Sequence, residues 1–460
     1  MKIKRLIFFA ALLLTVASGA WATPVPKVIW CSGNTTLYFV NDETTYGGEG
    51  NNTYDNASIT GVYPLSSKND WRNAAKDGCT KVVFDNSFAS VRPTNCNVWF
   101  FEFYELTTIE GLTNLDTSEV IDLSYMFAQC QKLQSLDLSS FNTSKVTDMG
   151  TMFFNCFGLS TLDLSSFDTS LVESIVRMFS GCKNIKNLTV ATGWTKIGSR
   201  EDCFFDFSPS TINLVLDDDK DSHCLLEEFK VLISGKPVNV TLRNRTLQKD
   251  GNWNTLCLPF AVTLADSPLA GATLKELTAS ESSFDSNGKL TLTFVPATNI
   301  EAGKPYIIKW TSGSDNIVSP VFNGVTITSN TPTPVEFPNA VGANCQFVGQ
   351  YAPFSITDDN KNKILMLSTG NRLGYSQNAR TLRCFRAHFV IPTTTDAPAM
   401  TSYAIDFDGE EATDIISMHH SECIMHHEVY DLQGSKVDVQ PYSQLKKGIY
   451  IINGKKVLIP

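Results

Sequence analysis

The stretch LQSLDLSSFNTSKVTDMGTMFFNC, Leu133–Cys156, recurs almost unchanged as LSTLDLSSFDTSLVESIVRMFSGC, Leu159–Cys182. The two copies are 26 residues apart, and partial copies precede and follow them at Leu115–Cys130 and Ile185–Val190. A fixed period of this length is typical of repeat architectures, in which each unit is one small supersecondary structure. One unit cannot bury its own apolar side, so we expect neighbouring units to stack into one continuous core.

Each unit contains L-x-x-L-x-L followed by Phe, which is the spacing of a leucine-rich repeat. Alternate residues of a strand point to opposite faces, so the leucines are expected to point inward. The predicted core layers comprise Leu136, Leu138, Met149, Met152, Phe153 and Cys156. Looser copies predict further strands at Thr80–Phe84 and Thr211–Leu216.

The residues between the inward leucines are expected to line the concave sheet of this solenoid, where stacking turns them into columns. The candidate ligand-binding residues on this face are Ser135, Asp137, Ser139, Thr161, Asp163, Ser165, Asn187 and Thr189. Their small side chains leave room for a partner, and the two aspartates favour a basic or hydroxyl-rich ligand. The alternative interpretation is that small soluble residues only complete a repeat surface.

The repeat phrase LDLSSFDTSxVxxMxxMFxxC resembles that of BspA-like leucine-rich-repeat surface proteins, which also occurs in mycoplasma surface lipoproteins. The lead-in KVVFDNSFASVRPTNCNVWFFEFYELTTIEGLTNLDTSEV, Lys81–Val120, resembles the segment that opens such arrays in exported proteins of host-associated Bacteroidota. The resemblance covers about residues 26–190. It implies a surface or secreted interaction protein, with adhesion to host or bacterial partners as the usual proposal.

The second half of the chain loses the period after Arg245 and shows short apolar runs between Gly, Pro, Asn and Asp clusters. This pattern predicts an antiparallel β-sandwich. Two of its motifs, GNWNTLCLPF and RCFRAHFVIP, resemble a β domain that often follows such repeats in Bacteroidota surface proteins. The last segment, Val429–Pro460, resembles the type IX secretion C-terminal sorting domain through Lys447, Gly448, Tyr450, Lys455 and Lys456.

The first residues have the pattern of an export signal: a basic start, an apolar run over Leu6–Val16 and the pair Ala20 and Ala22. That run is short for a membrane span of about 20 residues, and no later stretch of the mature chain qualifies. We therefore predict a secreted or cell-surface protein on the outer-membrane exterior. The fold class is mainly β, and the predicted order is a signal peptide (1–22), an N-terminal region (23–79), a leucine-rich-repeat solenoid with flanking caps (80–244), a β-sandwich (245–408), a linker (409–428) and a C-terminal sorting-like β segment (429–460).

The 37 basic and 47 acidic side chains give a formal net charge of -10, which argues against a nucleic-acid partner. The sequence contains no phosphate-binding loop, nucleophile elbow or H-E-x-x-H motif. We therefore predict a protein that is not an enzyme, uses no cofactor, and recognises a host or bacterial surface protein or a glycan. One alternative is a carbohydrate-binding surface protein that uses the β-sandwich, and another is a hydrolase accessory chain.

Cysteines and acidic residues supply the remaining candidates. Cys130, Cys156 and Cys182 follow the repeat period, and buried free thiols are favoured over a disulfide between two of them. Four acidic residues occupy positions 1, 3, 5 and 12 of a calcium loop, but Ser222 stands where the sharp turn of such a loop needs Gly. We therefore predict an acidic turn and no metal; the four residues are Asp217, Asp219, Asp221 and Glu228. The histidine-rich run HHSECIMHH is interpreted as solvated linker.

Overall fold

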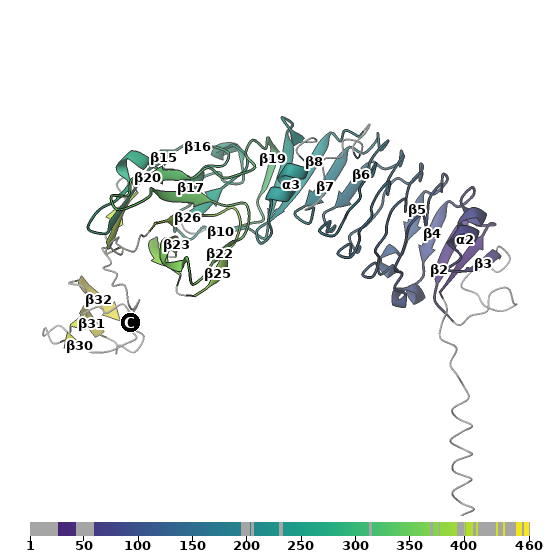
Figure 1. Cartoon of the computed structure of the whole chain (residues 1–460), viewed down its shortest axis with the longest axis horizontal. Coiled ribbons are helices and arrows are strands. Elements are labelled where there is room, and N and C mark those ends of the chain that lie inside the picture. The colour runs from purple at the N-terminus through teal and green to yellow at the C-terminus, as the bar shows by residue number, and fades with distance from the viewer. Residues whose placement is uncertain are drawn as a thin grey trace, which may run out of the picture. The chain divides into compact units, whose positions relative to one another are not determined.

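The computed structural model is mainly β in its described residues, whose strands form several sheets (Figure 1). The structure describes residues 26–42, 59–194, 203, 207–229, 233–311, 315–368, 371–376, 378–392, 400, 402–407, 411–412, 429–430, 436–437, 448–452 and 455–459. The predicted signal peptide lies outside this set, as does the predicted linker apart from residues 411 and 412. Within the described residues, no helix is both long enough and apolar enough to cross a membrane.

The chain divides into two compact units. The first comprises Met1–Leu277, Val295–Glu336 and Gln346–Val390, and the second comprises Thr278–Phe294, Phe337–Cys345 and Ile391–Pro460. Each unit collects segments that are far apart in the sequence. The domain boundaries predicted from the sequence stay predictions.

The first sheet joins an N-terminal hairpin to the start of the repeats. β1 (Lys27–Cys31) pairs antiparallel with β2 (Thr36–Val40), whereas β2, β4 (Lys81–Phe84) and β5 (Thr108–Glu110) run parallel. β3 (Ile59–Pro64) forms one edge of this sheet. The hairpin and the helix α2 (Lys68–Ala75) bury the aromatic side chains at the first end of the array, which a stack of repeats would otherwise leave open to water.

Successive repeats are joined by hydrogen bonds between equivalent backbone groups. Leu123 N donates to Asp148 O at 2.9 Å, and Met149 N donates to Ser174 O at 2.9 Å. Further along, four strands pair in parallel and lie side by side in Figure 1: β6 (Thr161–Leu164), β7 (Asn187–Ala191), β8 (Thr211–Asp217) and β9 (Val238–Arg243). The antiparallel strand β19 (Val321–Val325) covers the far edge of this sheet. One 26-residue step therefore advances the chain by one strand, as Leu162 opposite Leu188 illustrates.

The turns between strands repeat a left-handed backbone conformation that the leucine spacing does not reveal. Equivalent residues with positive φ, at 54 to 60°, are Tyr125, Thr151 and Arg177. A second equivalent set, at 57 to 79°, is Gln129, Asn155 and Gly181. Non-glycine residues rarely adopt this conformation, so the hydrogen bonds to the next repeat must stabilise it. Tyr125 N, for example, donates to Gly150 O at 3.0 Å.

The inward side chains follow the prediction with one correction. Leu138 is 1% exposed, and Met149, Met152, Phe153 and Cys156 are fully buried. Leu136 was predicted to belong to the same layers, but it is only partly buried at the margin of the core. Its equivalent, Leu162, is 2% exposed in β6, whereas no strand is assigned in the described segment around Leu136. This leucine position is therefore buried more deeply in the repeat that forms a strand.

Aromatic rings also stack once per repeat. Ring centroids lie 5.1 to 6.1 Å apart along a column formed by Phe100, Phe127, Phe153, Phe179 and Phe207. A second column, with centroids 6.2 and 6.5 Å apart, consists of Phe141, Phe167 and Trp194. Such columns place large apolar surfaces in contact between neighbours and hold the repeats in register.

The downstream strands contain short antiparallel sheets in the first unit. β17 (Pro305–Lys309) lies between β11 (Asn254–Cys257) and β13 (Thr273–Leu277), and β26 (Ala387–Val390) lies between β21 (Cys345–Gly349) and β23 (Ile364–Ser368). β24 (Arg372–Tyr375) pairs with β23, and β22 (Phe354–Ile356) pairs with β25 (Arg380–Leu382).

The second unit departs from the antiparallel expectation. In this unit β15 (Lys289–Ala297) and β27 (Ser402–Asp406) run parallel. The chain returns to the side of β15 only after more than 100 residues, which leaves room for the crossover that parallel pairing needs. The described backbone of the last segment forms a four-stranded antiparallel sheet. Its order is β30 (Lys436–Val437), β29 (Val429–Tyr430), β31 (Gly448–Ile452) and β32 (Lys455–Ile459).

Candidate functional site

The outward face of β6 and β7 brings together four of the predicted binding residues. Thr161 is opposite Asn187, and Asp163 is opposite Thr189. Thr161, Asp163 and Asn187 are exposed, whereas the leucines between them are buried. This alternation follows from the two-residue period of a strand. The structure therefore places the predicted columns side by side where strands form.

The aspartates of this face also stabilise local turns. Ser139 N donates to Asp137 Oδ1 at 3.0 Å, and Ser165 N donates to Asp163 Oδ1 at 2.9 Å. Hydrogen bonds from the Ser139 side chain and backbone hold the pKa of Asp137 below its usual value. Both repeats therefore use their aspartate as an Asx-turn acceptor. The backbone turn bonds use only Oδ1 of each aspartate, and both aspartates are exposed, so their carboxylates can accept further hydrogen bonds from a partner.

The polar column extends beyond the predicted residues into β8 and β9. Asn213 Nδ2 donates to Thr189 Oγ1 at 3.3 Å, and Asn239 Nδ2 donates to Asn213 Oδ1 at 3.0 Å. Gly324 N of β19 in turn donates to Asn239 Oδ1 at 3.0 Å. The leucine spacing missed both asparagines because β8 and β9 lack the repeat motif. Their alternating runs TINLVL and VNVTLR carry the only sequence signal for them.

Asp217, the first candidate of the calcium loop, is engaged by protein groups. It is 3% exposed, and its carboxylate accepts hydrogen bonds from Thr192 and from Arg243. Burial alone would raise the pKa of Asp217, but hydrogen bonds from Arg243 and Thr192 hold it below the usual value. Asp219 and Asp221 are exposed, and Asp221 Oδ1 accepts from His223 N at 2.8 Å. Nothing is described of the Glu228 side chain, and among the described residues no three metal-binding side chains cluster.

The repeated thiols are buried and carry no disulfide, as predicted. Cys130, Cys156 and Cys182 donate to the carbonyls of Phe100, Phe127 and Phe153 at 3.2, 3.1 and 2.9 Å. Burial raises the pKa of all three thiols, that of Cys182 to about 12. They are therefore protonated at neutral pH, which is the form with little nucleophilic reactivity.

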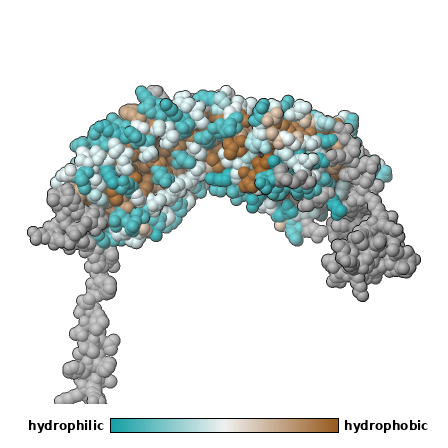
Figure 2. Space-filling view, turned by 180° about the vertical axis from the view of Figure 1, so that it is seen from behind, coloured by the Kyte–Doolittle hydropathy of each residue, from teal (hydrophilic) through white to brown (hydrophobic). Residues whose placement is uncertain are grey.

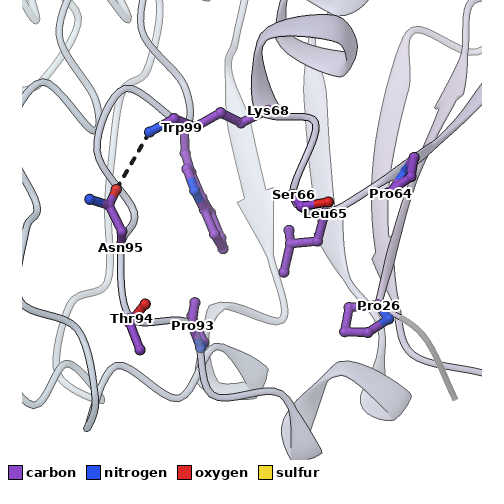
Figure 3. A pocket seen from close by; sticks show the side chains of 9 residues that line it. All are labelled: Pro26, Pro64, Leu65, Ser66, Lys68, Pro93, Thr94, Asn95 and Trp99. Atoms are coloured by element: carbon purple, nitrogen blue, oxygen red, sulfur yellow. Dashed lines mark hydrogen bonds between the residues drawn. The ribbon is translucent and has the colours of Figure 1, made fainter. Parts of the chain in front are cut away.

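A surface pocket lies beside the N-terminal hairpin (Figure 3). It has a volume of about 450 Å³, and proline rings, Leu65 and Trp99 form much of its wall. Lys68 Nζ donates to Asn95 Oδ1 at 3.5 Å across one side. Trp99 itself is 2% exposed and stacks on Phe39 with ring centroids 5.3 Å apart, so it packs in the core beneath this pocket.

The face drawn in Figure 2 mixes hydrophilic residues with apolar patches. Large apolar side chains with substantial exposure in the described residues include Ile121 at 50%, Tyr125 at 41% and Leu171 at 52%. Scattered apolar side chains of this kind are normal on a soluble protein. They do not by themselves locate an interface.

Comparison with known proteins finds one family. Residues 94–209 match the family described as "Mycoplasma protein of unknown function, DUF285", which is the mycoplasma-type repeat expected from the motif. The match covers less than half of the chain. No curated protein and no solved structure matches the sequence.

Proposed function

We propose that this chain is an exported, non-enzymatic recognition protein of the cell surface or the medium. In this proposal residues 80–244 form a BspA-like leucine-rich-repeat solenoid, and its outward sheet face binds another protein on a host or bacterial surface. The downstream strands, proposed to form a β-sandwich, and the sorting-like tail complete the exported protein.

The solenoid part of the proposal is supported by how regularly the repeats are joined. Three kinds of contact connect one unit to the next at equivalent positions: backbone hydrogen bonds, stacked aromatic rings, and hydrogen bonds from cysteine thiols to backbone carbonyls. Each repeat contacts chiefly its neighbours in such an arrangement, as in known repeat proteins. This geometry extends the outward residues into a continuous surface rather than an isolated loop.

The observation that carries the function is the register of the outward polar side chains. From β6 to β9 the positions of Asp163, Thr189, Asn213 and Asn239 form one row across the parallel sheet. Inward residues alone form the apolar core, so most of this row can vary with little effect on stability. A flat row of small polar groups suits a protein partner better than a buried small molecule.

Removing the negative charge of the two repeat aspartates tests whether the outward face binds the partner. Asp137→Asn together with Asp163→Asn removes two negative charges but keeps an oxygen that can accept the turn hydrogen bonds. We expect binding to cells or to an immobilised partner to weaken, and its salt dependence to become flatter. Binding is measured at two salt concentrations, on protein whose folding has been checked by circular dichroism.

A matched control removes two carboxylates elsewhere on the repeats. Glu119→Gln with Glu173→Gln causes the same change of net charge at exposed positions outside the row. The control should bind like the unmodified protein. Equal loss of binding in both double variants would show a general charge effect, and no loss in either would remove the outward face from the proposal.

A further inference from the structure

A pocket of about 420 Å³ lies among the downstream strands of the first unit. Its walls come from the segment that enters β11, from the end of β23, and from β25 to the start of β26. More than 100 residues separate the first of these segments from the second. The volume is in the range of small-molecule sites in proteins.

Three arginines line this pocket at different depths. Arg245 is 4% exposed, the Arg386 side chain is 28% exposed, and Arg380 is exposed. The carboxylate in the described lining belongs to Asp250, whose Oδ1 accepts a hydrogen bond from Asn252 N at 3.0 Å. Cationic side chains therefore outnumber carboxylates around the cavity.

Arg245 is the buried cation of the set and has no carboxylate partner among the described residues. Its Nη1 donates to Thr246 O at 3.1 Å and its Nη2 to Thr255 O at 2.7 Å, while its buried Nε has no hydrogen-bond partner. Burial lowers the pKa of Arg245 to about 9. The nearby Arg386 charge adds to this effect and the Asp218 charge opposes it, and the side chain is still protonated at pH 7. A buried cation without an ion pair of its own is costly to bury, which makes it unusual as a purely structural feature.

Arg386 differs because it has a direct ion pair with a carboxylate. Its Nη1 lies 2.5 Å from Oδ1 of Asp218, a fully buried carboxylate, and also donates to Cys384 O at 3.1 Å. These bonds fix the guanidinium but use only Nη1, so the N–H groups of Nε and Nη2 can still donate hydrogen bonds to a ligand. Asp218 thus orients Arg386. Arg383 Nη1 lies 3.7 Å from the other oxygen of this carboxylate, and Asp218 also acts on Arg245, so one negative charge is shared among three guanidinium groups.

We propose that this pocket binds a small, hydroxyl-rich carboxylate of the uronic acid class. A planar carboxylate matches the paired N–H groups of a guanidinium, so Arg380 and Arg386 bind it while Arg245 supplies positive charge beneath them. Gln248 and Ser368 add an amide and a hydroxyl to the lining, and these groups suit the hydroxyls of a sugar ring. The inference goes beyond the proposed function, because it assigns a second site with a different ligand.

Three probes test the ligand class on the mature full-length chain. Dissociation constants for D-glucuronate, D-glucose and acetate are measured by ligand-observed NMR at one ionic strength. We expect glucuronate to bind about tenfold more tightly than either of the other two, because only glucuronate offers both groups. Equal affinity for glucose would overturn the role of the carboxylate, equal affinity for acetate would overturn the role of the hydroxyls, and no saturable binding would overturn the site.

Arginine variants test the residues. Arg380→Gln changes an exposed side chain and should weaken glucuronate binding by about fivefold or more, whereas Arg177→Gln, an exposed arginine of the repeats, should leave it unchanged. Arg245→Gln should also weaken binding in protein whose folding is confirmed by circular dichroism. Unchanged affinity in Arg380→Gln would overturn the arginine assignment, even if Arg245→Gln does not fold. The double variant Asp137→Asn, Asp163→Asn should retain glucuronate binding, which separates this site from the proposed repeat face.

Discussion

At the scale of single residues, the two leucines at equivalent repeat positions are not equivalent in burial. Leu162 is 2% exposed inside β6, whereas Leu136 is partly buried. Leu162→Ala should lower the free energy of unfolding by about 2 to 5 kcal/mol, because it removes apolar contacts and leaves a cavity. Leu136→Ala should cost clearly less. Urea unfolding measures both, with the exposed Thr161→Val as a near-neutral control; equal costs for the two leucines would contradict the difference in packing.

A second residue-scale prediction concerns His388, which is 2% exposed and stacks on Phe354 at 4.6 Å. Burial lowers the pKa of His388 to about 4 from 6.5. The unfolded chain therefore gains a proton near pH 6.5, but the folded chain gains it only near pH 4, so stability should fall as the pH drops through this window. The loss attributable to this group is about 3 kcal/mol.

The variant His388→Gln isolates that contribution because glutamine does not titrate. Its unfolding free energy, measured in urea between pH 7 and pH 4, should fall less steeply than that of the unmodified protein. His223→Gln serves as the control at a partly exposed histidine and should keep the steep fall. If His388→Gln and the unmodified protein gave parallel curves, the buried histidine would not be the cause.

At the scale of elements, side-chain hydrogen bonds connect one repeat to the next. Thr143 Oγ1 donates to Asp168 O at 2.8 Å and accepts from Asp168 N at 2.7 Å, and Thr117 makes the same pair of bonds to Asn142. Both threonines are 1% exposed. The F-[ND]-T-S phrase of the repeat is therefore structural, since its threonine satisfies the backbone of the following unit.

Thr143→Val tests this connection with a side chain of nearly the same shape. The variant leaves both backbone groups of Asp168 without these partners, so we expect a loss of about 2 kcal/mol in unfolding free energy. The exposed Thr161→Val changes the same chemical group in β6 and should stay within about 0.5 kcal/mol of the unmodified protein. Equal effects in both variants would show that the threonine column contributes nothing specific.

At the scale of the whole molecule, the predicted type IX export makes the C-terminal segment a sorting signal for crossing the outer membrane. The described backbone of Val429–Pro460 forms a small antiparallel sheet, and Gly448, Tyr450, Lys455 and Lys456 of the sorting motif lie on β31 and β32. Lys447 lies outside the described residues. Deleting this segment should leave the protein in the periplasm, as measured by cell fractionation. A truncated chain that reaches the surface or the medium at normal levels would remove type IX export from the proposal.

The sequence by itself determined the features that depend on the repeat period. The 26-residue step, the inward positions around Leu162 and the buried thiols of Cys130, Cys156 and Cys182 all follow from it, because stacking brings each residue onto its equivalent in the next unit. The outward row of Asp163 and Thr189 follows for the same reason.

Only the tertiary structure decided the contacts between segments that share no period. Asn213 and Asn239 extend the polar row although their strands lack the leucine motif. Asp218 meets Arg386 across 168 positions of sequence, and Arg245 lies beside the same pocket as a buried cation without an ion pair of its own. The physical reason is that periodicity specifies only which equivalent residues become neighbours. Which distant strands become neighbours depends on how whole sheets pack, and a local sequence pattern does not predict it.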